Sequence, residues 1–216
     1  GEDQSPASRG FERSYVLLQG SHHHFGDDQG QDWVSAGAAS TYRDDGAMVL
    51  YPRGAFSADV FTDKMLTYLS EASKKRRPFF AYLAFTQPHW PIQAPEADIR
   101  KYRGRYDAGP AVLRAERIAR MKKLGLIPQD MEIRGPQGAI DWNALPSATK
   151  GAEARKMEVY AAMIDRMDQN IGRVIAKLRS TGQLSNTIII FMSDNGADSN
   201  QLSAPMARGE YKVDSA

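Results

Sequence analysis

Apolar residues are concentrated in a few segments of the chain, and their spacing predicts the secondary structure. Residues 57–75 repeat apolar side chains with the period of a helix; Ser57 can cap its start, and Pro78 follows its end. Residues 153–181 form the longest segment with this period, and Gly182 is a typical residue just beyond a helix. The pattern therefore predicts two long helices, each with an apolar face.

Two short apolar runs instead predict strands that are buried on both faces. Residues 187–191 are a run of β-branched and aromatic residues, and residues 78–85 form a second apolar run. Each run follows a predicted helix, an order typical of proteins in which helices cover a sheet. Residues 13–18 fit a short strand, and residues 111–123 fit a basic helix. We therefore expect an α/β fold with a central, mostly parallel sheet flanked by helices, forming one partial domain over residues 1–216.

The end of one predicted strand carries candidate metal ligands. Asp194 and Asn195 follow residues 187–191 directly, and ligands of parallel sheets collect at the carboxyl ends of strands. Carboxylate and amide oxygens suit a hard cation such as Ca²⁺ or Mg²⁺. An ordinary turn, in which Asn195 and Gly196 supply positive φ, explains the same residues without a metal. From these residues alone the turn is the simpler explanation.

The other predicted strand leads into a loop that contains His89. Pro88, Pro91 and Pro95 restrict the backbone of this loop, because each proline fixes its own φ. Taken alone, a histidine in such a loop is more often structural than catalytic.

Composition excludes several classes of partner. The 28 basic and 26 acidic residues nearly balance, giving a net charge of +2 and no general drive toward nucleic acid or acidic lipid. No apolar run approaches the roughly 18 residues of a membrane span.

The absence of cysteine excludes disulfides and a Cys nucleophile within the chain. Periplasmic, secreted and cytoplasmic locations all stay open, as does the oligomeric state.

Three further clusters have simple structural explanations. The adjacent histidines at 22–24 lie in a Gly- and Ser-containing loop and are predicted to be solvated. Asp44 and Asp45 precede Gly46 and predict a turn rather than a metal pair. The basic residues at 74–77 fit the C-terminal end of a helix, where positive charge is favourable.

An ordered set of motifs resembles the sulfatase family, in particular arylsulfatases of the alkaline-phosphatase-like superfamily. A strand ends in Ser-Asp-Asn-Gly at 193–196, and an upstream strand leads into Pro-His-Trp-Pro at 88–91. Three further segments match the family: Arg-Gly-Phe-Glu-Arg-Ser-Tyr at 9–15, Leu-Gly-Leu-Ile-Pro at 124–128 and residues 160–168. Each motif is weak alone, but the order along the chain is the family order and covers roughly residues 9–198.

The resemblance implies a role for three residues. His89 matches the histidine that contacts the sulfate group near the leaving oxygen, and Asp194 and Asn195 match two oxygen ligands of a divalent cation, usually Ca²⁺. The family nucleophile is a formylglycine hydrate, made from the Cys or Ser of a Cys/Ser-x-Pro-x-Arg motif. The implied activity is hydrolysis of a small-molecule or glycan sulfate ester.

The chain departs from the family pattern at the nucleophile. It contains no Cys and no Ser-x-Pro-x-Arg match, since Pro6 follows Ser5 directly. The usual N-terminal Asp-Asp pair and a Gly-Lys-Trp-His segment are also missing, and Lys212 lies too close to Asp194 for the family's later lysine. We therefore expect a central part of a sulfatase domain that is inactive alone. Alternatives are a phosphodiesterase or phosphonate monoester hydrolase of the same superfamily, or a non-catalytic module that binds anions or a partner.

Overall fold

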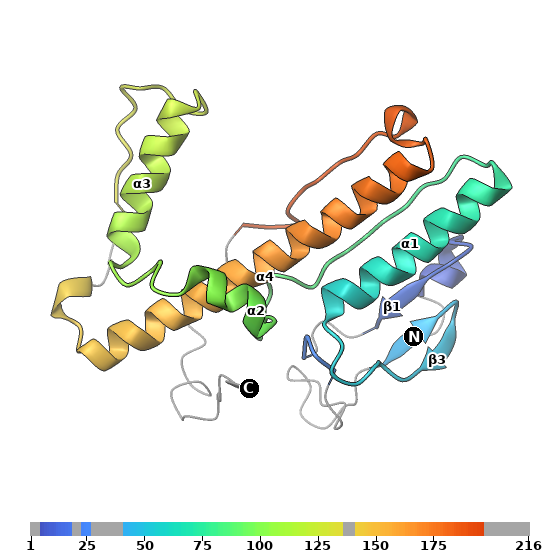
Figure 1. The fold of residues 1–216 in the computed structure, drawn as a ribbon, viewed down its shortest axis with the longest axis horizontal. Helices are drawn as coiled ribbons and strands as arrows, with labels where there is room; N and C mark the ends of the chain where they lie inside the picture. Colours follow the sequence, from blue (N-terminus) through green and yellow to red (C-terminus); the bar gives the residue numbers. More distant parts are fainter. Residues whose placement is uncertain (1–4, 19–22, 27–40, 136–140, 197–216) are drawn as a thin grey trace. The chain divides into compact units, whose positions relative to one another are not determined.

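The computed structural model describes most of the chain and divides it into two compact units. The larger unit contains Gly1–Thr86 and Met167–Ala216, and the smaller one contains Gln87–Arg166. Figure 1 shows the fold, whose described residues are 5–18, 23–26, 41–135 and 141–196.

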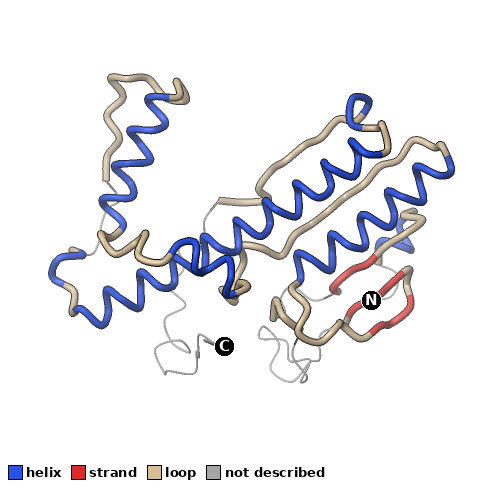
Figure 2. Tube along the Cα trace, viewed as in Figure 1, coloured by secondary structure: helices blue, strands red, loops and turns tan. Residues whose placement is uncertain are grey.

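The larger unit contains a small antiparallel sheet. Its strands are β1 (Tyr15–Leu17), β2 (Tyr42–Asp44) and β3 (Ala47–Val49), hydrogen-bonded in the order β1-β2-β3 and drawn in red in Figure 2. A short 3-10 helix, η2 (Pro6–Arg9), precedes them. The strand predicted within residues 13–18 is therefore confirmed.

Helix α1 (Ser57–Lys75) has the predicted bounds and buries the predicted face. Its Met65 and Leu69 pack against Leu178 of helix α4 (Ser147–Ser180) in one apolar cluster. Ser57 does not cap the helix as predicted: the N-cap is Phe56, and no side chain makes a cap hydrogen bond.

Helix α4 is longer than its apolar period predicts. It begins at Ser147 instead of near residue 153, and the boundary between the two units falls within it, after Arg166. At its end, Gly182 takes a φ of 70° and donates its backbone N–H to the carbonyl of Arg179, as predicted for a residue just beyond a helix. The 3-10 helix η5 (Leu184–Asn186) follows.

The smaller unit is helical among its described residues. Its elements are α2 (Glu96–Ile99), the 3-10 helix η3 (Arg100–Tyr102), α3 (Pro110–Lys123), the 3-10 helix η4 (Trp142–Ala144) and the first part of α4. Helix α3 confirms the basic helix predicted near 111–123 and contributes no buried residue. The core is formed by one apolar cluster: Ala94, Ile99, Val159, Ala162 and Met163.

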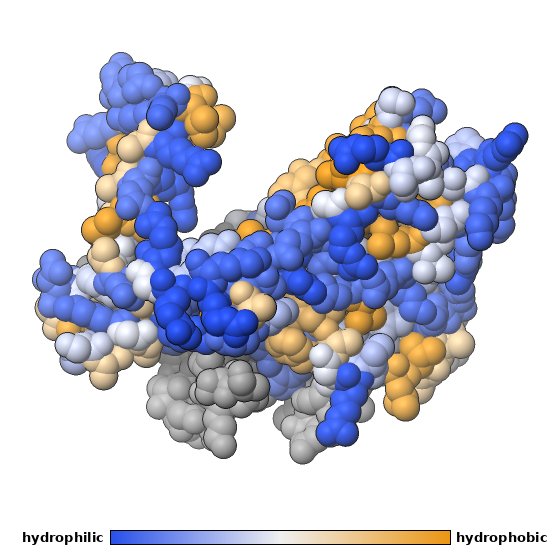
Figure 3. All heavy atoms as spheres, viewed as in Figure 1, coloured by the Kyte–Doolittle hydropathy of each residue, from blue (hydrophilic) through white to orange (hydrophobic). Residues whose placement is uncertain are grey.

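The prediction of two buried strands is wrong for the described chain. Residues 78–85 and 187–191 are loops with apolar side chains in solvent; Phe80 is 79% exposed and Ile190 is 78% exposed. Figure 2 draws both segments as loops beside the long helices, and Figure 3 shows apolar side chains among hydrophilic ones on the face it draws. The physical reason is that a strand needs the backbone of a neighbour, and no described segment pairs with either run. Accordingly, the described residues show a small antiparallel sheet but no central parallel one.

No helix within the described ranges is both long and apolar enough to cross a membrane.

Candidate active site

His89 lies at the surface in the loop that follows residues 78–85. Its Nδ1 lies 2.6 Å from the backbone carbonyl oxygen of Trp90. Because a carbonyl oxygen only accepts, Nδ1 must carry the proton of this hydrogen bond. In the neutral ring Nε2 is then the basic nitrogen, and a second proton at Nε2 turns it into a donor. The loop thus fixes the tautomer of the neutral His89 ring.

Asp194 and Asn195 form an exposed bend after residues 187–191. The backbone N–H of Asn195 donates to Asp194 Oδ1 at 2.9 Å, and Asn195 Nδ2 donates to the carbonyl of Gly196 at 2.7 Å. The hydroxyl of Ser193 closes the bend by donating to the carbonyl of Asn195. Asp194 Oδ2 and Asn195 Oδ1 accept no hydrogen bond from the described residues, so each of these oxygens is a candidate cation ligand.

These two residues fit a divalent cation only as part of a larger set of ligands. Ca²⁺ takes six to eight oxygens, and Mg²⁺ takes six. Within the described ranges, no group of three or more His, Cys, Asp or Glu side chains could hold a metal. Asp194 and Asn195 belong to the larger unit, whereas His89 belongs to the smaller one. The three predicted site residues therefore come from different units of the chain.

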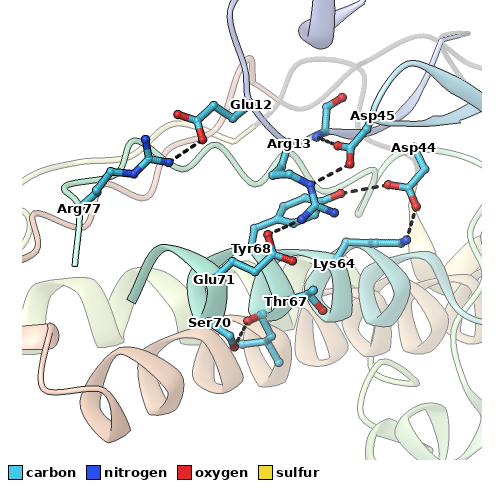
Figure 4. Close-up of polar contacts among 12 residues, drawn as sticks. Glu12, Arg13, Asp44, Asp45, Lys64, Thr67, Tyr68, Ser70, Glu71 and Arg77 are labelled. Atoms are coloured by element: carbon cyan, nitrogen blue, oxygen red, sulfur yellow. Dashed lines mark hydrogen bonds and ion pairs between the residues drawn. The ribbon is translucent and has the colours of Figure 1, made fainter. Parts of the chain in front are cut away.

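Asp44 ends β2, and Asp45 and Gly46 form the turn that leads into β3, which confirms the turn predicted here. Asp45 has a φ of 50° and is followed by Gly46 with a φ of 88°. Asp45 accepts from Arg13 Nε at 2.8 Å, and Asp44 pairs with Lys64 (Figure 4). Each carboxylate therefore has a cationic partner within the unit, which explains the two residues without a metal.

The ion pairs around this turn tie the sheet to α1. Figure 4 shows Arg13 between Asp45 and Glu71 of α1, with the hydroxyl of Tyr68 donating to Asp44 Oδ1 at 3.3 Å. The hydrogen bond from Arg13 holds the pKa of Glu71 below its usual value, and burial raises the pKa of Tyr68. These carboxylates have structural partners and need no ligand to explain them.

Sequence reasoning missed a buried polar cluster around His24. His24 Nδ1 lies 3.0 Å from Ser57 Oγ and 3.2 Å from Thr86 Oγ1, and the two hydroxyls are 3.2 Å apart. His24 is 2% exposed, so the prediction of a solvated histidine segment is wrong at this position. His22 lies outside the described residues. The burial arises because Phe25 and His24 pack their rings against Phe56, at 5.1 and 5.9 Å between centroids. The adjacent Phe25 was the local signal for burial.

Comparisons with known proteins identify the family. A model of the Sulfatase family matches residues 6–215. An uncharacterised sulfatase of Schizosaccharomyces pombe is 43% identical over 94% of this chain and 37% of its own length, and an arylsulfatase of Klebsiella aerogenes is 36% identical over 91% and 42%. A crystal structure of Ps i-CgsB in complex with k-i-k-neocarrahexaose has a similar fold, with a TM-score of 0.52 and 19% identity over 84% of this chain and 31% of that one. The chain spans about two fifths of the length of these two curated relatives. It belongs to the sulfatase family.

Proposed function

We propose that the complete protein carrying this chain is a sulfuric ester hydrolase of the arylsulfatase type. The observation that carries this proposal is the identity of 36% to an arylsulfatase over 91% of the chain, together with the family match over residues 6–215. The substrate is a small-molecule or glycan sulfate ester. In this family the site, rather than the fold, decides the chemistry, so each candidate residue needs its own argument.

His89 is proposed to act on the leaving group of the ester. With Nδ1–H held by the carbonyl of Trp90, a proton on Nε2 can be donated to the oxygen that leaves sulfur. This donation neutralises the negative charge that develops on the oxygen as the S–O bond breaks. His89 therefore contributes as a general acid whose orientation is set by its own loop.

Asp194 and Asn195 are proposed to hold a divalent cation, Ca²⁺ in the first instance, through Asp194 Oδ2 and Asn195 Oδ1. When bound, such a cation polarises the sulfate oxygens as a Lewis acid. The remaining ligands must come from outside this set, because two oxygens do not complete the coordination of Ca²⁺.

The nucleophile is proposed to be a formylglycine in a part of the protein outside this chain. The chain contains no Cys and no Ser-x-Pro-x-Arg match from which that group is made. Without a nucleophile, a covalent mechanism loses orders of magnitude in rate. We therefore expect the 216-residue chain alone to hydrolyse neither aryl sulfates nor aryl phosphates.

We further propose that the two apolar loops become strands of a mostly parallel sheet in the complete protein. Residues 79–85 and 188–192 make no backbone hydrogen bond with any described residue, although their aromatic and β-branched side chains are typical of paired strands. Residues 78–86 also border a groove of about 1080 Å³, whose other walls include residues 9–17 and both apolar and charged side chains of α1, among them Met65 and Glu71. A strand from the rest of the protein would cover these side chains and pair this backbone.

Hydrogen exchange tests this architecture. The amides of residues 79–85 and 188–192 should exchange rapidly in the chain alone and at least about a hundredfold more slowly in the complete protein. The amides in the middle of α1 serve as the internal reference, because they are hydrogen-bonded in both. Equal exchange of the two loops in both proteins would contradict the sheet.

Parallel assays on a chromogenic aryl sulfate and the matching aryl phosphate test the activity. The complete protein, produced in cells that convert Cys or Ser to formylglycine, should hydrolyse the sulfate faster than the phosphate. Chelation of divalent cations should abolish the turnover. Faster phosphate hydrolysis would favour a phosphodiesterase or phosphonate monoester hydrolase, and binding of aryl sulfate without turnover would favour a non-catalytic module; either result contradicts the proposal.

A further inference from the structure

The buried cluster of His24, Ser57 and Thr86 joins three distant parts of the larger unit. His24 comes from the described segment 23–26, Ser57 is the first residue of α1, and Thr86 is the last residue of the unit before the chain enters the smaller one. Their polar side-chain atoms lie 3.0 to 3.2 Å apart. A three-way contact of this kind restrains each backbone segment relative to the other two.

The backbone on both sides of His24 is also held in place. Ser57 donates its backbone N–H to the carbonyl of His24 at 2.7 Å, and Gly54 donates to the carbonyl of Gly26 at 3.2 Å. Gly26 has a φ of 61°, and a Cβ built there would lie 2.2 Å from the ring of Tyr51. These contacts hold the backbone of residues 24–26 in place, and so they also hold the position of the His24 imidazole beside Thr86.

Burial excludes catalysis by this cluster. The separation between His24 Nδ1 and Ser57 Oγ is short enough for a base to activate a nucleophile. However, both residues are only 2% exposed, so no substrate can contact the Ser57 hydroxyl in this conformation. The geometry instead suits a structural restraint on Thr86.

We propose that His24 and Ser57 are positioning residues for His89, acting through Thr86. Thr86 lies three positions before His89, and the intervening Gln87 is buried while Pro88 restricts the backbone between them. A restraint at Thr86 therefore limits the conformations open to the loop that carries His89. This inference rests on the proposed function, in which His89 contacts the sulfate ester.

The substitution Thr86→Val tests the proposal, because it keeps the shape of the side chain and removes the hydroxyl. The matched control is Thr67→Val in α1, which removes an exposed hydroxyl that donates to the carbonyl of Asp63 at 3.0 Å. In the complete protein, Thr86→Val should lower kcat on an aryl sulfate about tenfold with KM changed less than about twofold, since misplacement of a catalytic group acts mainly on turnover. Thr86→Ser should restore most of the activity, and Thr67→Val should leave it unchanged.

A second measurement tests the positioning role without an activity assay. In the isotopically labelled chain, the NMR order parameters of the His89 and Trp90 amides should fall toward the value of about 0.6 typical of flexible segments in Thr86→Val, and not in Thr67→Val. His24→Ala should produce the same change if it folds. If the complete wild-type protein does not hydrolyse sulfate esters, the proposed function fails, whereas the order parameters still decide whether the cluster restrains the loop.

Two outcomes would overturn the inference. One is an unchanged kcat together with unchanged order parameters in Thr86→Val. The other is a loss of activity in Thr86→Val that follows only from a lower melting temperature and a smaller folded fraction. In that case the cluster stabilises the unit without positioning His89.

Discussion

Asn170 of α4 donates its side-chain Nδ2 to Asp59 Oδ1 of α1 at 2.7 Å, across 111 positions of sequence. Asn170 is 1% exposed, so this hydrogen bond lies inside the larger unit. Arg173 extends it by donating Nη1 to Asn170 Oδ1 at 2.8 Å and by pairing with Asp63 at the surface. The two long helices are thus joined by a specific polar contact as well as by the apolar cluster of Met65, Leu69 and Leu178.

We expect Asn170→Ala to lower the free energy of unfolding by about 1–3 kcal/mol, because it removes a buried donor from a carboxylate. Asp63→Ala is the comparison, since it removes the largely exposed ion pair with Arg173 and leaves the contacts of Asn170 in place, and such exposed pairs contribute about 1 kcal/mol or less. Urea denaturation followed by circular dichroism measures both. An Asn170→Ala protein as stable as Asp63→Ala would contradict the role of the buried contact.

Gly26 and Gly54 provide a matched pair of glycine substitutions. Both have positive φ, but a Cβ at Gly26 would overlap the Tyr51 ring, whereas nothing lies within 4 Å of a Cβ at Gly54. We expect Gly26→Ala to be the more destabilising by about 1–3 kcal/mol, the cost of overpacking, in addition to the backbone strain that both share. Equal losses in thermal melts of the two variants would show that the segment around His24 is not packed as described.

Tyr15 should make the larger unit sensitive to alkaline pH. Burial, with a smaller effect of Asp44, raises the pKa of Tyr15 to about 12, whereas the pKa of an unfolded tyrosine is about 10. The folded state therefore binds this proton more tightly, and the stabilisation is complete below about pH 10 and lost as the pH rises toward about 12.

Tyr15→Phe tests this dependence. The Tyr15 hydroxyl is buried without a hydrogen-bond partner among the described residues, so its removal should maintain or raise the free energy of unfolding at about pH 8. It should also reduce the loss of stability between about pH 10 and 12 in denaturant titrations at stepped pH. Tyr82→Phe, at an exposed ring, is the control. A Tyr15→Phe protein with an unchanged alkaline profile would assign the pH dependence to other groups.

The sequence predicts the helices well and the sheet badly, for physical reasons. The bounds of α1 and the end of α4 at Gly182 follow from local signals, namely the apolar period and residues that end helices. The runs at 78–85 and 187–191 have the composition of strands, but pairing depends on partners distant in sequence, and none lies in the described chain. The same dependence on distant contacts explains why His24 was expected in solvent although Phe56, Ser57 and Thr86 surround it.

Among the site predictions, the one that rests on a local signal is confirmed, and those that depend on ligands or distant residues stay predictions. The turn at Asp44 and Asp45 was correct because the following Gly46 is a local signal. The roles of His89, Asp194 and Asn195 stay predictions, because they concern ligands and distant residues that local sequence does not specify.

Metal binding by the chain alone should be weak. Asp194 and Asn195 supply two oxygens, while Asp44 and Asp45 are paired with Lys64 and Arg13. Isothermal titration calorimetry with Ca²⁺ should give a dissociation constant above about 10⁻⁴ M, which corresponds to the weak end of protein calcium sites. Asp194→Asn should weaken it further. Sub-micromolar binding that survives Asp194→Asn would reveal a different site.

The rate of aryl sulfate hydrolysis by variants of the complete protein tests the account most directly. His89→Ala should lower kcat about a hundredfold or more, as expected for loss of a general acid, and Asp194→Ala should lower it further by weakening the metal site. Asp168→Ala, an exposed carboxylate of α4, is the matched control and should retain full activity. The measurement is made with formylglycine present and Ca²⁺ saturating. Full turnover by both His89→Ala and Asp194→Ala would contradict the assignment of these residues to the sulfatase site.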